Sequence, residues 1–202
     1  SVATVGDVNG DGYADVIIGA PEQNTGPDTD PIEGGVFVWF GNINGLGSPG
    51  KPVNASWHYY GQGCCGWHAH YRFGESVSTA GDVNGDGYSD IIVGSPKAKP
   101  NATNPEYEGA AYLYYGDTDT RYIEEDWWYE NYGRENDFGS SVGTAGDVNG
   151  DGYDDIIVGA RRYNINFPEN IRGGSFGWYG NSIRPNRAPD WRVFGGLNPQ
   201  WT

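Results

Sequence analysis

Short apolar runs separated by glycines recur along the chain. Three of them are rich in β-branched residues, follow an acidic glycine-rich loop and end at a glycine: 16–18, 91–93 and 156–158. These runs are too short for helices and are bounded by residues that break helices, so they predict buried strands. No segment shows the long amphipathic period of a surface helix.

Three further kinds of segment accompany each buried strand. A run of small residues leads into each loop, at 1–7, 76–82 and 141–147. After the buried strand come an aromatic run between glycines (34–41, 109–116 and 173–180) and a Trp-bearing run that ends at glycine (57–61, 127–133 and 191–195). Aromatic and β-branched residues favour strands. The chain therefore repeats a four-stranded unit three times, and such tandem units are typical of β-propeller blades.

Two short sequence motifs flank the loop and its buried strand, and together they resemble a known repeat. Phe-Gly stands before the second and third loops, at 73–74 and 138–139, and Gly-Ala-Pro closes the first buried strand at 19–21. The unit resembles the FG-GAP repeat, the blade of integrin α-chain β-propellers and of many secreted bacterial proteins. The closing word becomes Gly-Ser-Pro at 94–96 and Gly-Ala-Arg at 159–161, which weakens the turn of the third unit but not its loop.

The resemblance implies an all-β fold made of three four-stranded blades, in a propeller or an open propeller-like array. The predicted blades span 1–72, 73–137 and 138–202, and the first lacks its leading Phe-Gly. Propellers usually close with about four to eight blades. We therefore expect a partial or processed chain completed by further sequence or by another chain. A longer array, a six-bladed ring of two copies and a head-to-tail polymer all stay open.

The acidic loop has one spacing in all three units: Asp-x-Asn-x-Asp-Gly-Tyr-x-Asp. Calcium takes about six to eight oxygen ligands, and a glycine at position 6 allows the sharp turn that gathers them. Side chains at positions 1, 3, 5 and 9 and the backbone carbonyl at position 7 are the predicted donors. They are Asp7, Asn9, Asp11, Tyr13 and Asp15; Asp82, Asn84, Asp86, Tyr88 and Asp90; and Asp147, Asn149, Asp151, Tyr153 and Asp155. The sequence thus predicts three Ca²⁺ sites.

Two other interpretations of the loop are weaker. An EF-hand needs a bidentate Glu at position 12 and a flanking helix, whereas position 12 here is Ile18, Val93 or Val158, inside a predicted strand. Asp-Gly and Asn-Gly words also make simple turns. A turn needs one or two such residues, not four oxygen ligands at matched spacing in three copies.

Composition narrows the class of partner. The net charge is −15, from 27 acidic and 12 basic residues, which argues against a nucleic acid, because phosphate binding needs basic patches. The sequence has no apolar run of about 18 residues, so membrane insertion is not expected. With 34 Gly but also 8 Trp, 15 Tyr and 7 Phe, the chain has enough apolar area to fold.

One variable segment carries other candidate chemistry. Cys64 and Cys65 are adjacent, and either a strained vicinal disulfide or two free thiols fits them. His68 and His70 would share one side of a strand and could add to a transition-metal site with these thiols, but the spacing matches no standard zinc pattern. Asn54 and Asn101 match the N-glycosylation pattern.

The sequence contains no catalytic motif, and most of the acids in its repeated motif are assigned to calcium. We therefore expect a protein that is not an enzyme. The expected function is that of an extracellular, secreted or cell-surface calcium-binding protein with a structural or adhesive role. Its expected partner is itself or further repeats, with a protein or glycan ligand in addition. The alternative is a carbohydrate-recognition module or a non-catalytic part of a secreted hydrolase, with Trp127 and Trp128 as the ligand face.

Overall fold

The computed structural model describes residues 1–23, 34–46, 51–61, 72–98, 109–118, 125–131, 136–163 and 173–195. Strands β1 to β12 dominate these residues, and the only helical element among them is a 3-10 turn, η1 (Pro52–Asn54). The all-β class predicted from the pattern of apolar runs is confirmed.

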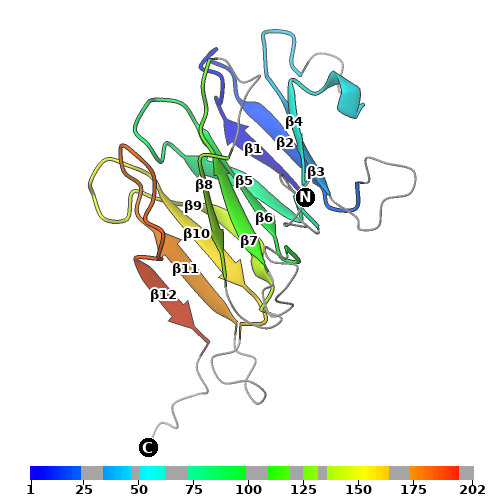
Figure 1. Ribbon diagram of the computed structural model, residues 1–202. Helices are drawn as coiled ribbons and strands as arrows, with labels where there is room; N and C mark the ends of the chain where they lie inside the picture. The colour runs from blue at the N-terminus through cyan, green and yellow to red at the C-terminus, as the bar shows by residue number, and fades with distance from the viewer. Residues whose placement is uncertain are drawn as a thin grey trace, which may run out of the picture.

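The strands form three separate four-stranded antiparallel sheets, which lie next to one another in chain order (Figure 1). The first sheet holds β1 (Val2–Gly6), β2 (Asp15–Ala20), β3 (Gly35–Trp39) and β4 (Trp57–Tyr60). The second holds β5 (Ser76–Gly81), β6 (Asp90–Ser95), β7 (Ala110–Tyr114) and β8 (Trp127–Glu130). The third holds β9 (Phe138–Gly146), β10 (Asp155–Ala160), β11 (Gly174–Trp178) and β12 (Trp191–Phe194). Each sheet follows chain order from its first strand to its fourth, as expected for the blade of a propeller.

The apolar runs alternate between the two faces of each sheet. In β6, Ile91 and Val93 pack toward the first blade, whereas Ile92 packs toward the third, so the whole strand is buried. In β2, Ile17 is fully buried against the second blade, but Ile18 points the other way and is 40% exposed. The middle blade has a neighbour on each side, so β6 is buried on both faces, whereas β2 of the first blade is buried on one. Strand β3 of the first blade is also buried along its whole length.

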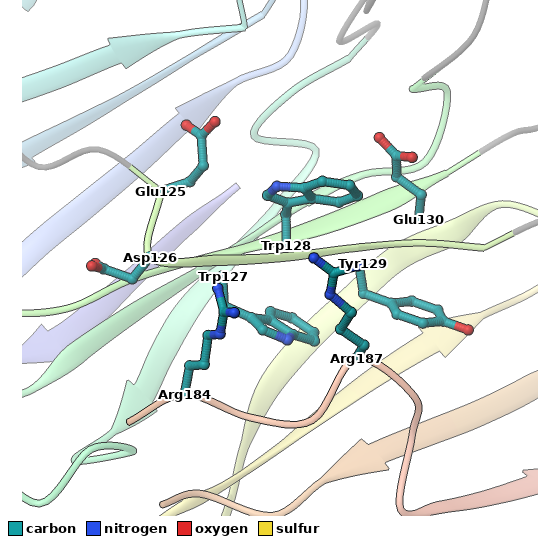
Figure 2. Close-up of a pocket in the computed structure, with 8 residues that line it drawn as sticks. All are labelled: Glu125, Asp126, Trp127, Trp128, Tyr129, Glu130, Arg184 and Arg187. Carbon is teal, nitrogen blue, oxygen red and sulfur yellow. The ribbon is translucent and has the colours of Figure 1, made fainter. Parts of the chain in front are cut away.

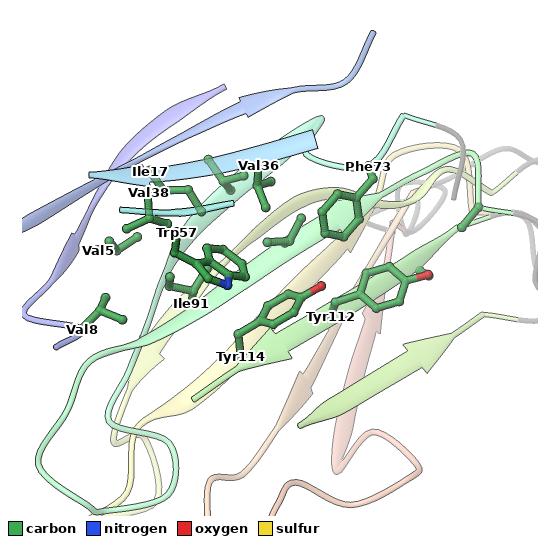
Figure 3. Packing of buried hydrophobic residues seen from close by; sticks show 14 residues of the cluster. Val5, Val8, Ile17, Val36, Val38, Trp57, Phe73, Ile91, Tyr112 and Tyr114 are labelled. Atoms are coloured by element: carbon green, nitrogen blue, oxygen red, sulfur yellow. The ribbon is translucent and has the colours of Figure 1, made fainter. Parts of the chain in front are cut away.

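The hydrophobic cores lie between blades rather than inside them. The first core joins β2 and β3 to β6 and β7, with Trp57 against Tyr114 at 5.4 Å between ring centroids (Figure 3). The second core repeats this contact between the second and third blades, with Trp127 against Trp178 at 5.2 Å. Sheets of this kind bury their apolar faces only by stacking on a neighbour.

Candidate metal centres

The three predicted calcium loops connect the first two strands of each sheet, β1 to β2, β5 to β6 and β9 to β10. All the predicted ligand residues lie within the part of the chain that the structure describes. The loops repeat one hydrogen-bond pattern, so they share one backbone conformation as well as one sequence.

The first carboxylate of each loop accepts hydrogen bonds from several backbone NH groups of the turn. Asp82 accepts hydrogen bonds from the backbone NH groups of Gly85 at 2.7 Å, Asp86 at 3.0 Å and Gly87 at 2.9 Å. Asp147 does the same in the third loop, and hydrogen bonds led by that from Gly152 lower its pKa. The side chains at positions 3 and 5 also bond within the loop. The turn is therefore built around the same oxygens that the sequence assigns to calcium.

The carboxylates at position 9 are fully buried: Asp15, Asp90 and Asp155 are each 0% exposed. Asp90 accepts from the NH of Val83 at 2.8 Å and from that of Gly116 at 2.9 Å. Burial raises the pKa of Asp90 to about 8; the two NH bonds oppose this rise, and the nearby carboxylates of Asp86 and Asp82 add to it. A cation beside this cluster would favour the ionised form.

The donor set fits calcium by its chemistry. It consists of carboxylate and amide oxygens, and a carboxylate oxygen that accepts one NH bond keeps a further lone pair. Among the described residues, however, no group of three His, Cys, Asp or Glu side chains is gathered closely enough to hold a metal ion. In Asn9, the side-chain amide donates to Asp11 at 3.1 Å, which holds two of the predicted ligands against each other. Ion binding would require these side chains to rearrange.

Each loop also docks on the loop of the preceding blade, a contact that sequence reasoning missed. The ring of Tyr88 lies against Gly10, and that of Tyr153 lies against Gly85, where an added Cβ would overlap the ring. The NH of Ser89 donates to the carbonyl of Asp7 at 3.0 Å. The available signal was that a tyrosine stands at position 7 of every loop, but the sequence does not show that its ring packs on the preceding blade.

Trp127 and Trp128 face opposite sides of β8, as Figure 2 shows, and this corrects the predicted ligand face. Trp127 is 4% exposed and donates from its indole Nε1 to the carbonyl of Asn186 at 3.2 Å, so it belongs to the core. Trp128 is 51% exposed. It lies at a hollow of about 370 Å³ lined by Glu125, Asp126, Trp127, Trp128, Tyr129, Glu130, Arg184 and Arg187.

The remaining candidates separate into two groups. Cys64, Cys65, His68, His70 and Asn101 lie outside the described residues, so their predicted chemistry stays untested. Asn54 ends the 3-10 turn η1 and is exposed, and glycosylation at Asn54 stays a prediction.

A charged contact between the second and third blades was not predicted. The Asp137 side chain is 1% exposed and accepts from Lys97 Nζ at 2.7 Å and Arg161 Nε at 2.8 Å. Burial raises its pKa, but the hydrogen bonds from Lys97 and Arg161 outweigh that effect and lower it. The signal in the sequence was a change of charge before Phe-Gly, from Arg72 to Asp137.

Three stacked four-stranded sheets with matching acidic loops define a propeller-type repeat protein. The chain belongs to the FG-GAP repeat family, whose model matches residues 1–39, 73–114 and 138–175, one segment in each blade. The recognition made from Phe-Gly, the loop and Gly-Ala-Pro is confirmed.

Integrin α chains are among the similar proteins. Integrin alpha-PS2 of Drosophila melanogaster is 33% identical over 166 residues, which cover 79% of this chain and 11% of the relative. Integrin alpha-4 of Xenopus laevis is 30% identical over 157 residues, covering 76% of this chain and 13% of the relative. The chain thus spans little more than a tenth of the length of these curated relatives. Within the described residues, no helix is long and apolar enough to cross a membrane.

Proposed function

We propose that the chain is an extracellular calcium-binding blade array with a structural or adhesive role and no enzymatic activity. The observation that carries this proposal is the threefold loop, with the same oxygen donors, the same internal hydrogen bonds and the same place between the first two strands of a blade. The kinship with integrin α chains supports the adhesive role and the extracellular or cell-surface location.

In each loop the ion would be held by the side chains at positions 1, 3, 5 and 9 and the carbonyl at position 7. When bound, calcium would neutralise carboxylates that otherwise repel one another. The chain itself fixes the loop, because the buried position-9 carboxylate accepts a hydrogen bond from the segment just after β3, β7 or β11. The donors are the NH groups of Gly41, Gly116 and Gly180. Since the donors are not gathered closely enough to hold an ion without rearrangement, ion binding should contribute to folding.

Exposed residues at the two ends of the array support assembly with further blades. Val8 and Val83 are fully buried by the next blade, whereas Val148, their equivalent in the third blade, is 56% exposed. At the other end Tyr13 is 41% exposed, although its equivalents cover a neighbouring glycine. A second copy placed head to tail would cover both, and the same faces would also suit further blades or another chain.

The calcium role is tested by titration calorimetry and thermal melting. We expect three Ca²⁺ ions bound per chain and a clear fall in Tm on chelation with EDTA. Magnesium at equal ionic strength serves as the control, since Mg²⁺ demands a stricter octahedral geometry. A melting temperature that EDTA leaves unchanged would contradict a structural role for calcium.

Assembly is tested separately by light scattering at high protein concentration with calcium. We expect a mass above that of one chain that falls on dilution. A single monomer peak at every concentration would refute self-association and leave the calcium role standing.

Carbohydrate recognition is a second candidate, including a role beside the catalytic part of a secreted hydrolase. It is favoured by one observation, the exposed Trp128 beside the hollow in Figure 2, because an aromatic ring on a polar surface is a stacking platform for a sugar. Saturable binding on a glycan array that is lost in Trp128→Ala would support it, and the absence of any bound glycan would refute it.

A further inference from the structure

Strand β8 differs from its equivalents in the other two blades at one exposed position. The strands β4, β8 and β12 each begin with a tryptophan at the same place in the sheet register. The residue after this tryptophan is His58, Trp128 or Arg192. Trp128 is 51% exposed, and neither of the other blades has a tryptophan at its position. The repeated fold therefore does not require this ring.

The loop between β11 and β12 brings two arginines to the same place. Arg184 and Arg187 line the hollow of about 370 Å³ that Trp128 also lines. Both side chains extend from the loop toward β8, as Figure 2 shows. The corresponding loop of the second blade, residues 115–126, holds five acidic residues and one arginine, whereas residues 179–190 hold two arginines and one aspartate. The pair of arginines is thus as particular to this hollow as the tryptophan is.

The arginine loop is held by hydrogen bonds, but its guanidinium groups are not. The Asn181 side chain donates from Nδ2 to the carbonyl of Arg184 at 2.7 Å and accepts at Oδ1 from the NH of Arg184 at 3.0 Å. Further along, the carbonyl of Asn186 accepts from the indole of Trp127 at 3.2 Å. Within the described residues, neither the guanidinium of Arg184 nor that of Arg187 forms a hydrogen bond or an ion pair. The loop therefore presents two positive charges at fixed backbone positions.

Three acids line the same hollow, and none of them pairs with these arginines. Asp126 accepts from the NH of Tyr115 at 2.7 Å, and Glu125 accepts from the hydroxyl of Tyr59 at 3.1 Å. Burial raises the pKa of Glu130 to about 7, so this carboxyl is partly protonated at neutral pH. Carboxylate oxygens accept more than one hydrogen bond, and they can therefore also accept from hydroxyl groups of a ligand.

The lining residues lie on both faces of β8. Trp128 and Glu130 are on one side of the strand, and Trp127 and Tyr129 are on the other (Figure 2). Strand β8 is the last strand of its sheet. Side chains on opposite faces of a strand point away from each other, so a ligand that contacts both Trp128 and the arginines must extend across the outer edge of the strand. A single sugar ring is too short for this, whereas an oligosaccharide is long enough.

The chemistry of the hollow favours a sugar that carries a carboxylate. An exposed indole ring stacks on the apolar face of a sugar ring, and the acids accept hydrogen bonds from its hydroxyl groups. A guanidinium group matches a carboxylate in shape and charge and binds it through two parallel hydrogen bonds. A neutral sugar would leave both guanidinium groups without a charged partner.

We propose that the hollow beside β8 binds an acidic oligosaccharide, with one sugar ring on Trp128 and a uronate carboxylate at Arg184 and Arg187. The proposal rests on carbohydrate recognition, the second candidate function above, and deepens it by naming the class of sugar. It depends neither on calcium binding nor on how the blade array is completed.

A matched pair of ligands tests the proposal. The probes are tetragalacturonic acid and its fully methyl-esterified form, which have the same sugar rings and differ in charge. Each is titrated calorimetrically into the whole chain in excess calcium, so that chelation by the acid does not change the calcium concentration. We expect saturable binding of the acid, at least tenfold tighter than that of the ester. Higher salt should narrow this difference.

Variants of the chain locate the bound sugar. Arg184→Gln and Arg187→Gln should each weaken binding of the acid several-fold and leave binding of the ester unchanged. Trp128→Ala should weaken binding of both probes at least tenfold. Arg192→Gln is the matched control, because it removes an exposed charge of the same blade outside the hollow, and it should bind as the wild type does. These side chains are exposed or half-exposed, so folding is not at risk.

Equal affinity for the acid and the ester would overturn the acidic-sugar proposal and leave carbohydrate recognition standing. Binding of the acid that both arginine variants leave unchanged would place the sugar elsewhere, for example on calcium in the acidic loops, and would also overturn the proposal. Absence of acid binding at millimolar concentration overturns it as well. In that case a neutral glycan that binds on the array through Trp128 would show that carbohydrate recognition itself survives.

Discussion

The ring of Tyr88 occupies the space that a side chain at Gly10 would need, so neighbouring acidic loops are packed against each other. The same relationship joins Tyr153 to Gly85, but nothing lies within 4 Å of a Cβ placed on Gly150. The three glycines share a positive φ of +72°, +75° and +78°. They therefore differ in their neighbours and not in their backbone.

This difference predicts unequal effects of one substitution. Gly→Ala at each position costs about 1–2 kcal/mol for the left-handed conformation. At Gly10 and Gly85 the clash with the tyrosine ring should add about 1–3 kcal/mol. Urea unfolding of the three variants, with and without calcium, measures the difference, and Gly150→Ala is the internal control. Equal losses at all three sites would show that the loops do not pack on one another in solution.

The buried carboxylate of Asp137 predicts a pH-dependent contribution to stability. Asp137→Asn removes a charge that Lys97 and Arg161 share, which should cost about 2–4 kcal/mol at pH 7. The folded pKa lies below the ordinary value of 3.8, so this contribution is present above pH 4 and is lost as pH falls through the folded pKa.

Denaturant melts of wild type and variant between pH 7 and pH 3 should therefore converge at the acid end. Arg72→Gln is the matched control, because Arg72 holds the equivalent position with its side chain 41% exposed. Its loss should stay within about 1 kcal/mol. A constant gap between wild type and Asp137→Asn across this pH range would contradict the ion-pair explanation.

The proposed calcium sites predict that removing one ligand lowers the number of bound Ca²⁺ ions by one. Asp151→Ala removes a proposed ligand of the third loop and should reduce the bound Ca²⁺ from three to two. Asp154→Ser changes a neighbouring acid that is not a proposed ligand to the residue found at Ser89, and it should keep three. Calorimetric titration measures both. Loss of an ion in Asp154→Ser, or none in Asp151→Ala, would disprove the ligand assignment.

The adjacent tryptophans of β8 should lose very different amounts of stability when each is replaced by Ala. Trp127→Ala opens a cavity against Trp178 and should cost about 3–5 kcal/mol. Trp128→Ala removes a half-exposed ring and should change stability by about 0.5 kcal/mol or less. Thermal melting compares the two. Similar losses would mean that Trp128 is also covered in the folded protein.

The fold was predictable because its signals are local. Strand β2 is recognisable from three β-branched residues between a loop and a glycine, and the loop from its own spacing. The role of Tyr88 was hidden, since only its carbonyl matters inside its loop while its ring belongs to the preceding blade. Likewise Trp127 and Trp128 are neighbouring residues of the same type. Which of them is buried depends on the face of β8 on which the third blade stacks. The blade limits 1–72, 73–137 and 138–202 stay a prediction.

The placement of the cores between blades sets how stability is shared along the chain. Three blades enclose two cores, so a blade at either end takes part in one core and the middle blade takes part in both. Loosening an end blade would thus expose one core and leave the other intact, whereas loosening the middle blade would expose everything apolar at once. We therefore expect the end blades to unfold more readily than the middle blade. A further blade stacked on one end would give that end blade a second core and so stabilise it.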